Sequence, residues 1–88
     1  MMLPVPKAVA DASLDAAILL CLARYPGLRR YEIEDDRAVV AILAQAPTTK
    51  RARTWMVAAM KRLSERGAIE KHTGRHGWFL THPEAVAS

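Results

Sequence analysis

Residues 48–80 read TTKRARTWMVAAMKRLSERGAIEKHTGRHGWFL, and this stretch decides which fold class the chain is expected to adopt. Thr48 or Thr49 is a suitable N-cap, and Gly67 stands where a helix commonly ends. Between them the apolar residues recur at helical spacing and share one stripe at ~100° per residue: Ala52, Met56, Ala59, Met60 and Leu63. The stretch therefore predicts an amphipathic helix over residues 49–66.

A β-hairpin is expected after this helix, with strands over residues 68–72 and 77–81. Gly74 and Gly77 supply the backbone freedom that a tight turn needs. Side chains that alternate inward along the strands are expected to pack on the helix: Ile69, Trp78 and Leu80. Arg75 would then project at the tip of the hairpin.

Two further helices are expected upstream of this unit. Periodic apolar residues predict one helix over residues 13–24 and another over residues 36–46, with an extended segment over residues 28–33 between them. The ends are predicted to be a loose N-terminal arm, residues 1–12, and a short C-terminal tail, residues 82–88.

The order of these elements predicts the fold class and the domain organisation. We expect one α+β, mostly helical domain over residues 13–81, with three helices and a C-terminal two-stranded hairpin. A single cysteine, Cys21, cannot form an internal disulfide, which favours a reducing compartment. Neither a secretory signal nor an apolar run long enough for a bilayer is evident, so a cytoplasmic protein is expected.

The basic side chains are concentrated in one block. Residues 48–76 carry eight basic and two acidic side chains, whereas residues 1–47 carry five basic and six acidic ones. The formal net charge of +4 therefore originates in the 48–76 block. Clustered positive charge of this kind is typical of a surface that binds a polyanion.

Enzymatic and metal chemistry have little support in the sequence. His72, His76 and His82 are the only histidines, and they fall on or beside the expected hairpin without a cysteine or carboxylate that completes a metal site. No nucleophile–base pair, Gly-rich phosphate loop or paired carboxylates are evident. Neither an enzyme nor a bound metal or cofactor is expected.

Residues 57–80, VAAMKRLSERGAIEKHTGRHGWFL, resemble the winged helix-turn-helix family, of which the MarR-like and related small bacterial or phage regulators are the nearest comparison. The shared pattern is a helix with apolar residues three and four apart, then Arg66-Gly67 followed by Ala68-Ile69, then a wing. The chain lacks the long terminal dimerisation helices of the MarR-like regulators. The resemblance implies a small transcriptional regulator that binds double-stranded DNA sequence-specifically. The 49–66 helix would enter the major groove, and the wing tip, residues 73–76, would reach the adjacent backbone or minor groove.

Eight residues are the predicted DNA contacts. Their helical angles and the resemblance place four on the surface that faces the groove: Arg53, Thr54, Ala58 and Lys61. Three more are predicted to contact phosphates, and the last is the cation of the wing: Lys50, Arg51, Arg62 and Arg75. Trp55 and Trp78 are expected to pack rather than to stack on bases.

Two other kinds of partner stay open. The same basic face could bind an acidic protein, which would make the domain a winged-helix protein–protein interaction module such as a phage or mobile-element adaptor or inhibitor. A homodimer is also compatible with the sequence, formed through the first helix or the N-terminal arm. No membrane partner is expected.

Overall fold

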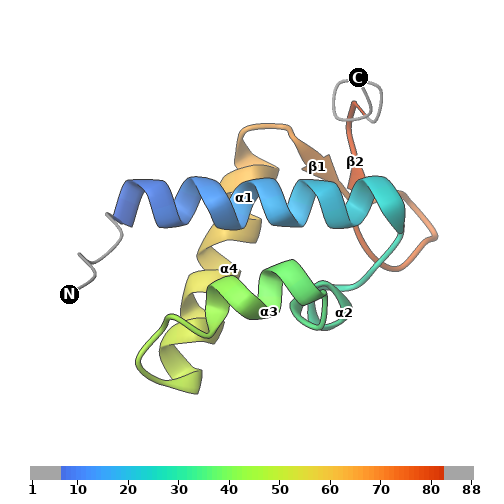
Figure 1. Ribbon diagram of the computed structural model, residues 1–88. Helices are drawn as coiled ribbons and strands as arrows, with labels where there is room; N and C mark the ends of the chain where they lie inside the picture. The colour runs from blue at the N-terminus through green and yellow to red at the C-terminus, as the bar shows by residue number, and fades with distance from the viewer. Residues whose placement is uncertain (1–6, 83–88) are drawn as a thin grey trace.

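The computed structural model describes residues 7–82, which form four helices followed by a small antiparallel hairpin (Figure 1). The predicted α+β, mostly helical, winged-helix-like fold class is confirmed. In chain order the elements are α1 (Lys7–Arg24), α2 (Arg30–Glu34), α3 (Arg37–Leu43), α4 (Thr49–Glu65), β1 (Ile69–Glu70) and β2 (Phe79–Leu80). None of these helices is long and apolar enough to span a membrane.

The first helix begins earlier than predicted. α1 starts at Lys7, so the prediction of a loose arm was wrong for residues 7–12; residues 1–6 and most of the predicted tail, residues 83–88, lie outside the described part. No proline follows Lys7 before Pro26, so the sequence does not interrupt a helix there. The alanine-rich residues that follow have high helix propensity.

The segment between the first two predicted helices is also different. Residues 30–34 form the short helix α2, so the predicted extended segment is reduced to the neighbourhood of Leu28. The backbone N–H of Arg29 donates to Glu32 Oε1 (2.9 Å), which satisfies one donor at the start of α2. Asp36 then caps α3, where its Oδ2 accepts from the backbone N–H groups of Ala38 and Val39.

Leu28 pairs with the hairpin instead of forming a strand of its own. The N–H of Trp78 donates to the carbonyl of Leu28 and the N–H of Gly27 donates to the carbonyl of Trp78, both at 2.8 Å. Gly77 lies so close to this segment that an added Cβ would overlap the carbonyl oxygen of Gly27. The start of α2 is thereby fixed beside the base of the hairpin.

The fourth helix matches the prediction closely. The Oγ1 of Thr48 accepts from the N–H of Arg51 (3.1 Å) and caps α4 at its start. The predicted inward stripe is buried except for Ala52, which is half-buried: Met56, Ala59, Met60 and Leu63. These residues pack against the inward side of α1, which includes Leu14, Ile18 and Leu22.

The hairpin strands are shorter than predicted, with two residues each. They pair antiparallel, with Ile69 opposite Leu80, and both of these side chains are buried in the core as expected. Trp78 is half-buried and packs against the same core. The hairpin is therefore held to the helical body at its base, and its tip extends away from it (Figure 1).

Candidate nucleic-acid interface

The exposed part of α4 is divided into two flanks. The α1 flank comprises Arg51, Trp55, Ala58 and Arg62, which line a groove of about 450 Å³ together with residues of α1. Rotation by ~100° per residue places a second set of exposed residues on the other side of the helix, which we call the hairpin flank: Lys50, Arg53, Val57 and Lys61. Thr54 lies between the two flanks and lines the groove of the first.

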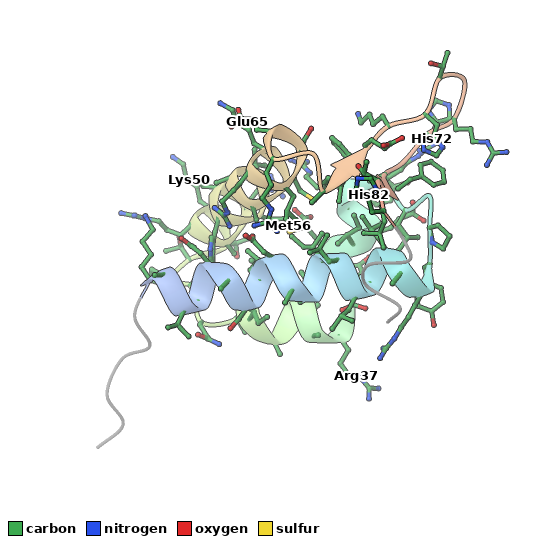
Figure 2. The ribbon with its side chains drawn as sticks, turned by 90° about the horizontal axis from the view of Figure 1, so that it is seen from above. Arg37, Lys50, Met56, Glu65, His72 and His82 are labelled. Carbon is green, nitrogen blue, oxygen red and sulfur yellow. The ribbon has the colours of Figure 1, made fainter. Side chains whose placement is uncertain are left out.

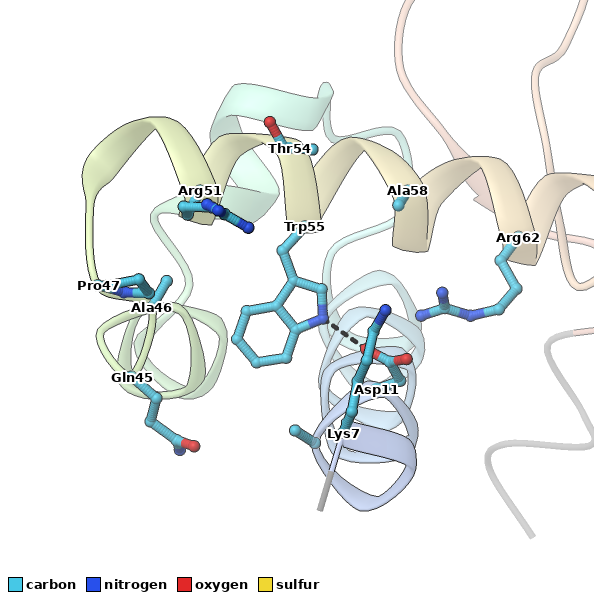
Figure 3. A pocket seen from close by; sticks show the side chains of 11 residues that line it. Lys7, Asp11, Gln45, Ala46, Pro47, Arg51, Thr54, Trp55, Ala58 and Arg62 are labelled. Atoms are coloured by element: carbon cyan, nitrogen blue, oxygen red, sulfur yellow. Dashed lines mark hydrogen bonds between the residues drawn. The ribbon is translucent and has the colours of Figure 1, made fainter. Parts of the chain in front are cut away.

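Two polar contacts join the α1 flank to α1, and Figure 3 shows the first of them. Trp55 Nε1 donates to Asp11 Oδ1 at 2.7 Å, so this indole packs between the helices as predicted. Arg62 Nε donates to Asp15 Oδ2 at 3.0 Å, and Nη2 donates to the other carboxylate oxygen. The carboxylate of Asp15 is buried, and its hydrogen bonds raise the pKa of Arg62 above the usual range of a guanidinium.

Arg62 therefore has a contact within the domain that the sequence did not predict, and its phosphate contact stays a prediction. Asp15 balances the charge of this partly exposed side chain, and a phosphate contact would compete with the ion pair. Arg51 and Ala58 are exposed, but they face the groove beside α1 (Figure 3). The hydroxyl of Thr54 donates to the backbone carbonyl of Lys50 (3.0 Å), so the hydroxyl proton already forms a hydrogen bond within α4.

The hairpin flank presents cations that remain available. Among residues 7–82 no acidic side chain pairs with Lys50 or Arg53, and both are exposed. Lys61 lies 3.8 Å from Glu65, but both side chains are strongly exposed and such a pair is weak. Val57, which is 41% exposed, lies between these cations as an apolar residue.

A second group of cations lies where the hairpin meets α2. Only one of them was predicted from the sequence as a contact residue. Arg75, the predicted wing cation, lines a groove of about 390 Å³ that also includes three further basic residues: Arg29, Arg30 and Lys71. We call these four residues the hairpin cluster. The Leu28–Trp78 pairing brings them together, because it fixes the start of α2 beside the hairpin. The adjacent arginines after Pro26-Gly27 were the available sequence indication.

Aromatic side chains shape the same groove. Lys71 Nζ lies 4.9 Å from the ring centroid of Trp78, within the range of a cation–π contact. Arg29 Nη1 donates to the hydroxyl of Tyr31 at 3.3 Å. Neither contact supplies a negative charge, whereas Arg30 Nε lies 3.9 Å from Glu34 Oε1 in a partly exposed ion pair.

The hairpin flank and the hairpin cluster form one continuous surface. Arg30 and Trp78 line the hairpin cluster's groove and also a second groove of about 340 Å³ that includes Val57 and Lys61. We refer to the combined surface as the basic face. In Figure 2 Lys50, Glu65 and His72 of the hairpin lie on one side of α1, whereas Arg37 points outward on the other side.

The histidines of the hairpin are not grouped around a common metal site. His72 stacks on Phe79 with ring centroids 4.0 Å apart, and its Nε2 lies 3.1 Å from Glu70 Oε2. His76 lines the groove of the hairpin cluster. Within residues 7–82 no three His, Cys, Asp or Glu side chains are grouped as a metal site would require.

No family model matches this chain, and no curated protein or solved structure matches it either.

Proposed function

We propose that this protein binds double-stranded DNA sequence-specifically, as a small transcriptional regulator, through its basic face. The observation that carries the proposal is the gathering of cations from α4, α2 and the hairpin on one side of the domain. A surface that follows a DNA backbone needs several cations along its length, and single charged helices do not supply them.

In this proposal α4 enters the major groove with its hairpin flank against the bases. The helix has 17 residues and is thus about 25 Å long, and a helix is narrow enough for a groove about 12 Å wide. The guanidinium of Arg53 can donate two hydrogen bonds to O6 and N7 of a guanine, and Val57 can contact a thymine methyl group. Lys50 and Lys61 lie on the same flank and would contact phosphates.

The hairpin cluster would hold the neighbouring backbone. Its four cations come from two elements that the Leu28–Trp78 pairing keeps together, so they meet the DNA as a preformed group. The wing tip, residues 73–76, would extend along the adjacent backbone or the minor groove. Phosphate contacts of this kind fix orientation, and the α4 contacts provide sequence preference.

A salt titration against random duplex DNA tests the proposal. If about five phosphates are neutralised, the logarithm of the association constant should fall against the logarithm of salt concentration with a slope near −4 to −5. Selection of bound duplexes from a random pool should then enrich one sequence. Undetectable binding at low salt would overturn the proposal.

An acidic protein is the second candidate partner. It is favoured by the exposed Val57 and the half-buried Trp78, which lie among the cations and resemble the apolar anchors of protein interfaces. The basic face would then make the domain an interaction module. In that case random duplex DNA would not bind, while a partner with an acidic surface would bind and would lose affinity on Val57→Asp substitution.

A further inference from the structure

The outer face of α1 carries no charge. α1 has 18 residues, of which only Lys7, Asp11, Asp15 and Arg24 are charged. Lys7 and Arg24 stand at the two ends, while Asp11 and Asp15 are directed to α4 by their contacts with Trp55 and Arg62. The face turned away from the core consists of small and apolar residues, all exposed: Val9, Ala12, Ser13, Ala16, Leu20 and Ala23.

This composition is unusual for a helix on a protein surface, which normally carries charged residues opposite its buried stripe. Val9 and Leu20 are 54% and 52% exposed, so two large side chains of this face are in contact with water. The residues recur three and four apart over the whole helix, which is the spacing by which two helices pack along a seam. α1 therefore has a second apolar stripe that no described residue covers.

We infer that a second copy of this chain covers the outer face of α1, with the two helices antiparallel. The sequence of the face is self-complementary about Ala16, which lies next to the midpoint of the helix. A two-fold axis at Ala16 places Val9 opposite Ala23 of the other copy, and Ala12 opposite Leu20. Each large side chain then meets a small one, and the small Ala16 lies at the crossing point, where the backbones can approach closely. A two-fold interface uses the same patch on both copies, so this complementarity within one helix selects another copy of itself.

The size of the face determines how stable such a dimer can be. An 18-residue helix is about 27 Å long. A seam between two helices of this length is at the small end of specific interfaces, below about 1,200 Å² in total. The dimer is therefore expected to form in the micromolar range and to depend on protein concentration. Lys50 and the hairpin lie to one side of α1 in Figure 2, and no residue of the outer face of α1 lines the grooves of the basic face, so association leaves that face open on both copies.

Sedimentation equilibrium tests the inference without reference to DNA. The unmodified chain should pass from monomer to dimer as its concentration rises through the micromolar range. Ala16→Glu should weaken association at least ten-fold, because it buries two carboxylates against each other at the crossing point. Ser64→Glu adds the same charge at an exposed position of α4 and should leave association unchanged, with far-ultraviolet circular dichroism showing that both variants are folded. A monomer at the highest concentration, or equal weakening by both substitutions, would overturn the inference.

Disulfide formation tests the antiparallel register. Ala16→Cys should form a disulfide between two copies under mild oxidation, since the two-fold axis brings equivalent positions within bonding reach. Ala12→Cys alone should not, because its partner is Leu20 of the other copy, but a mixture of Ala12→Cys and Leu20→Cys should cross-link. The native Cys21 is 3% exposed and should not react. The unmodified chain, which carries only Cys21, serves as the control and should not cross-link. Efficient cross-linking of Ala12→Cys alone would contradict the register.

Discussion

Arg62 and Asp15 form a bidentate ion pair that joins α4 to α1, with Arg62 Nε 3.0 Å from Asp15 Oδ2. The carboxylate side chain is only 10% exposed, whereas the arginine side chain is 36% exposed. The pair therefore lies between a surface ion pair, which contributes little, and a fully buried one. The ion pair gives Arg62, one of the predicted phosphate contacts, a structural role as well.

Asp15→Asn should therefore destabilise the domain. It keeps the shape of the side chain but leaves the partly buried guanidinium without its counter-charge, and we expect the free energy of unfolding to fall by about 1–3 kcal/mol. Urea denaturation followed by circular dichroism measures the change. Glu65→Gln removes one partner of the exposed Lys61–Glu65 pair and serves as the control, which should change little. Equal small effects of both substitutions would show that the Arg62–Asp15 contact contributes no more than a surface pair.

Gly77→Ala should be much more damaging than Gly74→Ala. Both glycines have a positive φ (+95° and +77°), a conformation that costs other residues roughly 1–2 kcal/mol. At Gly77 the added Cβ would also overlap the carbonyl of Gly27, whereas nothing lies within 4 Å of a Cβ at Gly74. We expect Gly77→Ala to separate residues 27–28 from the hairpin and to cost at least twice as much as Gly74→Ala in urea denaturation. Similar decreases in the free energy of unfolding would mean that the backbone at Gly27 can move away from the added Cβ at little cost.

The features that the sequence predicted are local, and those that it did not predict depend on contacts between distant residues. The α4 helix was foreseeable because its cap, its apolar stripe and Gly67 all lie within twenty residues. The hairpin cluster was not, because Arg29 and Arg30 meet Arg75 only through the Leu28–Trp78 pairing. The same holds for Arg62: its helical angle predicts an exposed cation, and its partner Asp15 lies 47 residues away in the sequence.

Cys21 should make stability fall at high pH. Burial, with a smaller contribution from the nearby Asp36 carboxylate, raises the pKa of this thiol from 9.0 to about 11. Since the folded state holds the proton more tightly, this stabilisation is fully present below pH 9 and is lost as the pH rises through 11. Cys21→Ala should flatten the pH dependence of the unfolding free energy between pH 9 and pH 11, and a thiol reagent at pH 8 should react with the unmodified chain only at the rate of unfolding. Rapid labelling of the folded protein would contradict this assignment.

The hairpin cluster should contribute affinity without sequence preference. We expect Arg30→Ala and Arg75→Ala each to weaken binding to all duplexes by a similar factor and to reduce the salt slope by about 1, because each removes one phosphate contact. Arg37→Ala is the matched control, since Arg37 is exposed on the side opposite the basic face (Figure 2). Fluorescence anisotropy at several salt concentrations measures both quantities. The proposed orientation would be contradicted by an Arg37→Ala effect as large as that of the cluster substitutions.

Arg53 and Ala58 distinguish which flank of α4 reads the bases. Both residues were predicted to face the major groove of DNA. In the structure Arg53 lies on the hairpin flank, whereas Ala58 lines the protein groove beside α1. If the hairpin flank meets the bases, Arg53→Ala should reduce affinity for the selected sequence by about 1–3 kcal/mol and relax preference at one base pair. Ala58→Gln should then have a small effect, because the larger side chain can extend over the groove beside α1. Affinities for the selected duplex and for its single-base variants decide between the flanks: loss of preference on Ala58→Gln with none on Arg53→Ala would place the α1 flank against the DNA.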